Sequence, residues 1–187
     1  MDKIEFFRHN LNEDDIALAN SVLGSIFLTT GPMVAQFERK FSQYLGTNEA
    51  VGLTSCTGAL HLAFLKNGVG PGDEVITTPM TFVASASAII EAGAKPVFVD
   101  VCPKSGLLLA GDVEKRITPR TKAILPVHLY GRMVDMRSFS RLAEKHNLIL
   151  IEDAAHAIEA VRDGIRPGQL SAAACFSFYA TKSMTCG

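Results

Sequence analysis

A lysine near the end of the chain, Lys182, is the first residue whose position suggests chemistry. It follows an apolar and aromatic run, residues 174–178, and it stands among small hydroxyl residues. A lysine held at the rim of a sheet can lose solvation and become a nucleophile. Taken alone, Lys182 is better explained as a solvated side chain, because lysine is rarely buried. Its role therefore depends on partners elsewhere in the chain.

Two earlier stretches carry groups that a lysine-bound cofactor needs. In residues 55–61, small residues run straight into a predicted helix, so Thr57 and Gly58 could hold a phosphate at the helix N-terminus. The alternative is that Thr57 simply caps this helix. Phe82 follows the next predicted strand and could either stack on a planar ligand or fill the core.

A carboxylate and a histidine follow a later strand. A carboxylate at the end of a buried strand is costly unless a cation pairs with it, so we expect Asp153 to have a protonated partner, unless it only caps a helix. Asp153, His156 and His128 could instead be three metal ligands. They lack a compact ligand motif, so we expect no metal site. Ser177 alternates with two phenylalanines just before Lys182.

The apolar periodicity predicts the elements that position these residues. Two helices separated by a turn at residues 29–32 are expected between Glu13 and Tyr44. Short apolar runs then alternate with helical stretches. The predicted strands are residues 50–54, 74–78, 97–101, 122–129, 148–152 and 174–178, and the predicted helices are residues 57–67, 82–91, 111–117 and 136–146. Residues 162–168 are expected to form a surface loop or hairpin.

Strands this apolar are covered on both faces, which predicts an α/β fold with a mostly parallel sheet between two helical layers. Ligands of such sheets bind at the C-terminal ends of the strands, where the candidates would meet. A phosphate pocket, an aromatic ring, a carboxylate and a lysine together suit pyridoxal phosphate (PLP), carried as a Schiff base. Asp153 would keep the pyridine nitrogen protonated, and Lys182 would move a proton between the substrate carbon and the cofactor.

The composition limits the function classes. The 187 residues include 18 basic and 19 acidic side chains, with no basic stripe, so we expect no nucleic-acid partner. No apolar run approaches the ~18 residues of a membrane helix, and the N-terminus lacks a signal-peptide pattern, so we expect a cytoplasmic protein without a membrane partner. The four cysteines show no metal-ligand spacing and are expected to be reduced, structural thiols.

Seven stretches, taken together and in order, resemble the DegT/DnrJ/EryC1/StrS family. Its members are PLP-dependent sugar aminotransferases with the aspartate aminotransferase fold, known as fold type I. The stretches are residues 29–32, 55–63, 70–76, 93–100, 127–131, 152–156 and 176–182. The resemblance therefore covers the chain from about Thr29 to its end.

The resemblance implies roles for the candidate residues. Lys182 would form the internal aldimine, and Asp153 would pair with the pyridine nitrogen. The other implied cofactor-binding residues are Phe82, stacked on the ring, His156, near the ring face or its 3-oxygen, and Thr57, Gly58 and Ser177, which hold the phosphate. The implied contacts with the sugar substrate are Thr30, Arg8 and His9.

The implied reaction transfers an amino group, commonly from glutamate, to a keto sugar carried on a nucleotide. The implied assembly is a homodimer with a shared active site. Family members are roughly twice as long, so the resemblance implies a helical arm (residues 1–30) followed by an incomplete PLP-binding large domain (residues 31–187) without the C-terminal small domain. One antiparallel strand beside residues 50–54 would also be missing, leaving that run without a neighbour on the sheet side.

Two alternatives to an active aminotransferase remain. The chain could be a truncated, non-catalytic fragment or a regulatory or binding relative that keeps the fold without turnover. It could also be a PLP-dependent sugar dehydratase. The dehydratases of the family replace the lysine with histidine, so Lys182 favours the aminotransferase.

Overall fold

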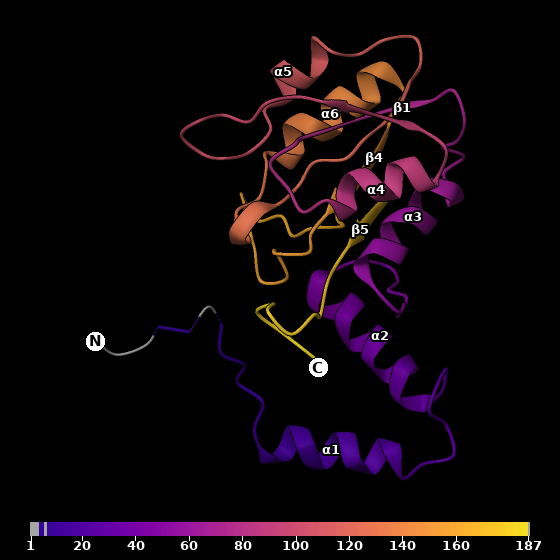
Figure 1. Ribbon diagram of the computed structural model, residues 1–187, viewed down its shortest axis with the longest axis vertical. Helices are drawn as coiled ribbons and strands as arrows, with labels where there is room; N and C mark the ends of the chain where they lie inside the picture. Colours follow the sequence, from indigo (N-terminus) through magenta and orange to yellow (C-terminus); the bar gives the residue numbers. More distant parts are fainter. Residues whose placement is uncertain (1–3, 6, 187) are drawn as a thin grey trace.

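A single parallel sheet forms the centre of the computed structural model, which describes residues 4–5 and 7–186. Residues 1–3 and 6 of the predicted arm and residue 187 of the predicted large domain lie outside the described residues. The strand order is β2-β1-β3-β4-β5 (Figure 1), and every neighbouring pair is parallel. The strands are β1 (Glu74–Thr77), β2 (Lys95–Phe98), β3 (Thr121–Ile124), β4 (Ile149–Asp153) and β5 (Ala173–Cys175). Their C-terminal ends therefore meet at one edge of the sheet.

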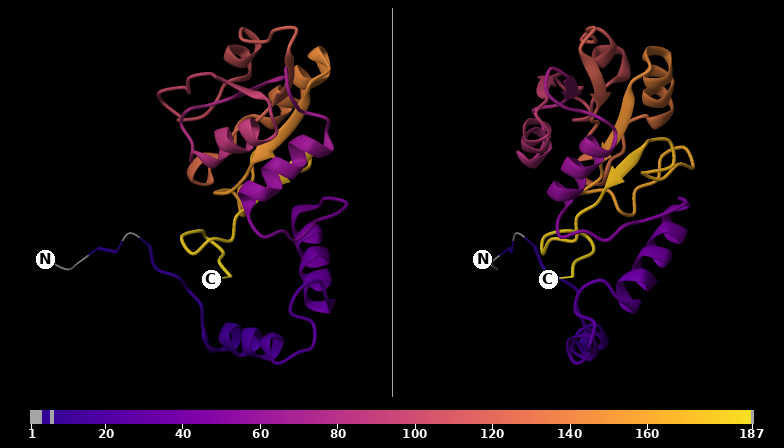
Figure 2. Two further views of the ribbon diagram at one scale, coloured as in Figure 1. Left: turned by 45° about the vertical axis from the view of Figure 1, so that its right-hand side comes forward. Right: turned by 90° about the vertical axis from the view of Figure 1, so that its right-hand side faces the viewer.

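Helices cover both faces of the sheet. Helices α3 (Cys56–Lys66) and α4 (Ala84–Glu91) pack on one face, while α5 (Ala110–Glu114) and α6 (Met136–His146) lie on the other (Figure 2, right). Two separate apolar cores fill the two interfaces. This confirms the predicted three-layer α/β/α class. None of the helices in the described part of the chain has the length and apolar character needed to span a bilayer.

Helix α6 shows why its bounds could be predicted from local sequence signals. Its buried residues recur at helical spacing, at Met136, Phe139, Leu142 and Ala143. The Asp135 side chain caps its N-terminus by accepting a hydrogen bond from the Ser138 N–H at 3.1 Å. The helix ends at Asn147, which takes the left-handed conformation (φ 51°) common at such ends. The predicted bounds of this helix, residues 136–146, are confirmed.

The predicted strand at residues 50–54 is wrong. These residues form a loop that pairs with no strand among the described residues, and Val51 and Leu53 are largely exposed. An apolar run becomes a strand only where a neighbouring strand takes its hydrogen bonds, and none lies beside this run. Strands β3 and β5 are also shorter than predicted. Strand β3 ends at Ile124 and β5 at Cys175, and the chain continues beyond each in irregular form.

The first two helices lie apart from the sheet (Figures 1 and 2). They are α1 (Glu13–Leu23) and α2 (Pro32–Leu45), which confirms the predicted pair separated by a turn. Helix α1 has no buried residue, although Ile16, Leu18 and Leu23 are apolar. Helix α2 contacts the segment after β5, where the Phe41 ring packs edge-on against the rings of Phe176 and Phe178.

We expect the core on the α6 face to be essential for stability. Replacing the fully buried Phe139 with alanine should reduce the free energy of unfolding by about 3–5 kcal/mol, because a large cavity remains. Phe82→Ala is the matched control, since the Phe82 side chain is 73% exposed and its removal should cost less than about 0.5 kcal/mol. Urea denaturation measures both values, and equal losses would contradict the packing described.

Candidate active site

Side chains from α3, α4, β4 and β5 meet at the C-terminal edge of the sheet. Burial raises the pKa of the Cys56 thiol, at the start of α3, well above its ordinary range. The charges of Asp153 and the neighbouring thiol of Cys175 add to this rise, and the charge of Lys182 opposes it. Burial likewise raises the pKa of Cys175 to about 12. Asp153, Cys175 and Lys182 therefore all lie near the N-terminus of α3, and all four cysteines are free thiols.

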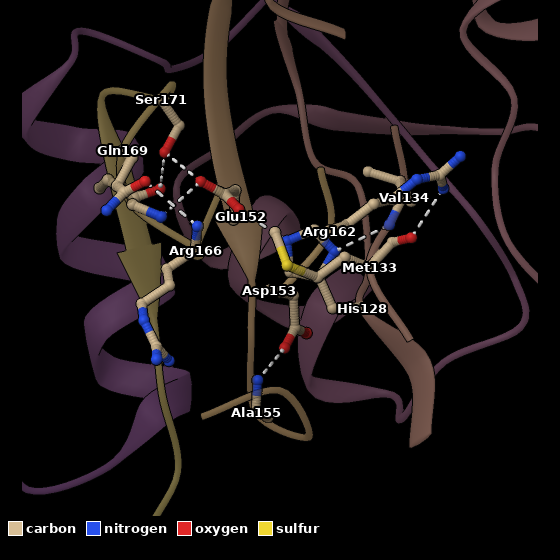
Figure 3. Close-up of polar contacts among 12 residues, drawn as sticks. His128, Met133, Val134, Glu152, Asp153, Ala155, Arg162, Arg166, Gln169 and Ser171 are labelled. Atoms are coloured by element: carbon tan, nitrogen blue, oxygen red, sulfur yellow. Dashed lines mark hydrogen bonds and ion pairs between the residues drawn. The ribbon is translucent and has the colours of Figure 1, made fainter. Parts of the chain in front are cut away.

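Asp153 is the last residue of β4 and is only 6% exposed. Its Oδ2 accepts a hydrogen bond from Ser85 Oγ at 2.6 Å. Its Oδ1 accepts one from the Ala155 N–H at 3.1 Å (Figure 3). Ser85 Oγ in turn lies 2.7 Å from Thr81 Oγ1. No helix begins after Asp153, so the alternative of a helix cap is wrong. The carboxylate is instead held by donors from α4 and from the following turn.

Lys182 lies beyond β5 in a turn that its own N–H closes on the Tyr179 carbonyl at 2.8 Å. The lysine is half-buried. The pKa of His156 is lowered mainly by burial and further by the charge of Lys182, while Asp153 opposes the shift. Lys182 and Asp153 therefore act electrostatically on the same two side chains, Cys56 and His156.

His156 is held by Tyr130. The two rings stack with centroids 5.5 Å apart and planes 13° from parallel. The Tyr130 backbone has φ 52°, a left-handed conformation that is uncommon for a tyrosine and clusters at functional sites. The lowered pKa of His156 favours the neutral form of its imidazole.

The N-terminus of α3 offers free hydrogen-bond donors. Its cap is Ser55, whose Oγ accepts a hydrogen bond from the Gly58 N–H at 3.0 Å. The alternative in which Thr57 is the cap is therefore wrong. The Thr57 hydroxyl and the backbone N–H groups of Cys56 and Thr57 have no partner in the part of the chain that the structure describes. Such donors at a helix N-terminus suit an anion.

Ser177 and Phe82 lie on the segments that adjoin β5 and α4. Ser177 lies two residues beyond β5, the strand against which α3 packs, and its Oγ accepts a hydrogen bond from the Tyr179 N–H at 3.3 Å. Phe82 lies just before α4 and is exposed, so the alternative that it fills the core is wrong. Its backbone carbonyl accepts a hydrogen bond from the N–H of Ser85, the residue that contacts Asp153.

The structure does not bring the three predicted sugar contacts to this edge. Thr30 lies in the turn between α1 and α2, and Arg8 and His9 lie before α1. All three are exposed, and the N-terminal segment runs away from the sheet (Figure 2, left).

His128 belongs to a different, fully buried network. Its Nδ1 accepts a hydrogen bond from the Val134 N–H at 3.4 Å, so its Nε2 carries the proton and donates to Glu152 Oε2 at 2.6 Å (Figure 3). Glu152 Oε1 also accepts hydrogen bonds from Ser171 Oγ at 2.5 Å and from the Gly168 N–H at 2.8 Å. Within the described residues, His128 therefore does not join Asp153 and His156 in a group that could hold a metal ion.

This network fixes the predicted loop at residues 162–168. The loop turns tightly between Arg162 and Ile165, which form an isolated antiparallel bridge. Asp163 and Gly164 at its tip both have positive φ. The Gly168 N–H then returns to Glu152, so the loop leads the chain back to β5.

The sequence matches the model of the DegT/DnrJ/EryC1/StrS aminotransferase family over residues 9–187. The chain belongs to this family. The match covers nearly the whole chain and confirms the resemblance that the seven stretches predicted.

Several named proteins are similar to this chain. GDP-perosamine synthase of Caulobacter vibrioides is 45% identical over 85% of this chain and 43% of its own length. Among solved structures, S. venezuelae DesV in complex with a ketimine intermediate is 43% identical, with a TM-score of 0.89 over 93% of this chain and 47% of its own. The putative sugar aminotransferase Spr1654 from Streptococcus pneumoniae, solved in a PLP form, is 34% identical, with a TM-score of 0.93 over 97% of this chain and 50% of its own.

These similarities confirm the predicted type I aminotransferase fold of the DegT/DnrJ/EryC1/StrS family. The chain spans about half the length of the relatives it matches.

The groups at the sheet edge fit the cofactor of the DegT/DnrJ/EryC1/StrS family. The free donors of α3 suit a phosphate, and the exposed Phe82 ring suits a planar heterocycle. The buried Asp153 carboxylate suits a protonated ring nitrogen, and the Lys182 amine suits an aldehyde. The residues at this edge therefore fit PLP.

Sequence reasoning missed Ser85, Thr81 and Tyr130. For Ser85 a signal was present, because it stands three and four residues before the buried Ala88 and Ile89 and so shares their helix face. Thr81 precedes α4 and stands four residues before Ser85. A polar residue in register with a buried stripe indicates a buried partner. Nothing local in the sequence indicated the left-handed backbone of Tyr130.

We expect Lys182→Met to raise the pKa of His156 toward 6.5, because the neighbouring cation that lowers it is removed. NMR titration of the imidazole resonances measures the change, with His156→Gln to identify the resonance. Lys122→Met, at an exposed position on β3, is the control and should leave the His156 pKa unchanged. A His156 pKa that stays the same or falls in Lys182→Met would contradict the proximity of the two residues.

Proposed function

We propose that the full-length protein is a PLP-dependent aminotransferase that moves an amino group from glutamate to a keto sugar carried on a nucleotide. Lys182 and Asp153 are its catalytic residues. The observation that carries the proposal is the meeting of these two opposite charges around Cys56 and His156, at the strand ends of a chain from this family. The name of the relative GDP-perosamine synthase supports a nucleotide-linked sugar as substrate.

Each residue of the site has a task in this proposal. When bound, PLP supplies a carbonyl that condenses with amines and a ring that accepts electrons. Lys182 would hold the cofactor through Nζ and would carry the proton to and from the substrate carbon. Asp153 holds the proton on the ring nitrogen. The remaining residues orient the cofactor: Thr57, Gly58 and Ser177 at the phosphate, Phe82 on the ring, and His156 at the ring face or its 3-oxygen.

We further propose that the enzyme acts as a cytoplasmic homodimer with a shared active site, in which Thr30, Arg8 and His9 approach the sugar. The exposed apolar residues of α1 support an additional packing partner for the arm. The four free cysteines suit a reducing compartment.

The direct test incubates the full-length protein with PLP, glutamate and a panel of nucleotide-linked keto sugars. We expect one amino sugar and 2-oxoglutarate to form in equal amounts, as followed by mass spectrometry. A deoxygenated sugar without a new amine would show a dehydratase instead. Cofactor binding without any turnover of the panel would favour a regulatory or binding relative.

A further inference from the structure

Asp153 carries a pair of hydroxyl groups that the proposed function does not use. Ser85, the second residue of α4, is completely buried, and its Oγ lies 2.6 Å from Asp153 Oδ2. Thr81 Oγ1 lies 2.7 Å from Ser85 Oγ. The three side chains come from two segments that lie 68 residues apart in the sequence, and they form an unbroken chain of short hydrogen bonds.

The direction of these hydrogen bonds follows from the number of protons. An ionised carboxylate only accepts, so Ser85 gives its single hydroxyl proton to Asp153. Ser85 Oγ then has only lone pairs for Thr81, so Thr81 donates to Ser85. Both protons point toward the carboxylate, and a chain ordered in this way strengthens its last bond. The Ala155 N–H holds the other oxygen, Oδ1, at 3.1 Å.

A role in packing alone does not require these hydroxyls. Ser85 shares its helix face with the buried Ala88 and Ile89, where an alanine would fill nearly the same space. The buried hydroxyl of Thr77 provides a contrast, because it donates to the backbone carbonyl of Leu125 at 2.9 Å and so joins two strands. The Ser85 hydroxyl instead donates to the ionisable side chain of Asp153.

We propose that Thr81 and Ser85 are positioning residues that orient the Asp153 carboxylate and stabilise its negative charge toward the cofactor ring nitrogen. This inference rests on the proposed function. Without the Ser85 hydroxyl, the carboxylate can rotate about Cβ–Cγ, and its Oδ2 holds a proton more tightly. Both changes move the shared proton from the ring nitrogen to Asp153.

The test uses the full-length protein loaded with PLP labelled with ¹⁵N in the ring, since the ¹⁵N resonance reports whether that nitrogen carries a proton. In Ser85→Ala we expect the resonance to move toward that of unprotonated pyridine and the dissociation constant of PLP to rise about tenfold. Thr81→Val should cause smaller changes in the same directions. Ser87→Ala is the matched control on the same helix, because the Ser87 hydroxyl has no hydrogen-bond partner among the residues described.

Three results would overturn the proposed role of Thr81 and Ser85. The first is a Ser85→Ala protein with wild-type affinity and an unmoved resonance. The second is weaker binding with an unmoved resonance, which would show that Ser85 only packs. The third is a wild-type protein that binds no PLP, which would overturn the proposed function as well. If circular dichroism shows that Ser85→Ala does not fold, the same two measurements on Thr81→Val decide.

Discussion

Replacing Lys182 with alanine should remove the visible absorbance of the PLP-loaded protein and slow amine transfer by about 10³-fold or more. The reason is that one amine performs two tasks, binding the cofactor covalently and moving the proton, and each contributes a large factor to the rate. The structure supports this assignment because Lys182 is half-buried and its charge reaches both Cys56 and His156. The absorbance spectrum after PLP addition and the rate of amino-sugar formation measure the two effects.

A second measurement locates the covalent bond in the wild-type protein. Borohydride reduction followed by peptide mass spectrometry should find the cofactor on the peptide that contains Lys182. Lys115→Ala is the control, since Lys115 is largely exposed and pairs with Asp112. It should keep the spectrum and the rate. A spectrum that survives in Lys182→Ala, or a cofactor found on another peptide, would show that a different lysine binds PLP.

Local sequence signals were sufficient for the helices and the fold class. Helix α6 carries a buried stripe, an aspartate cap and a left-handed asparagine at its end, and all three are short-range features. Strands depend on distant neighbours, so they were less predictable. The run at residues 50–54 is as apolar as true strands, yet it has no ladder partner and remains a loop.

The candidate site was predictable to the extent that strand order determines it. Asp153 and Lys182 follow parallel strands, and the C-terminal ends of parallel strands share one edge, so their proximity followed from the fold class. The contact between Ser85 and Asp153 could not be read in this way, because it depends on how α4 is rotated against the sheet. Only the family resemblance predicts roles for the arm residues Thr30, Arg8 and His9, and they lie away from the edge.

Neutralising Asp153 should mainly lower the rate, whereas neutralising the adjacent Glu152 should mainly lower the stability. The reason is that successive strand residues point to opposite faces of the sheet. In Asp153→Asn we expect amine transfer to fall by about 10²–10³-fold, the usual cost of removing a positioned electrostatic partner. The amide oxygen can accept from the Ala155 N–H while the NH₂ group donates to Ser85 Oγ, whose own proton can turn to Thr81 Oγ1, so the loss of stability should be small. The rate per folded molecule and urea denaturation measure the two properties.

Glu152→Gln should instead destabilise the fold by about 3 kcal/mol and leave the rate per folded molecule nearly unchanged. Three donors converge on Glu152: His128 Nε2–H, Ser171 Oγ–H and the Gly168 N–H. A glutamine amide must turn its NH₂ group toward at least one of them. His128 cannot accept instead by moving its proton to Nδ1, because that nitrogen already accepts a hydrogen bond from the Val134 N–H. If both variants lost activity and stability in the same proportion, the assignment of Asp153 to catalysis and of Glu152 to stability would be wrong.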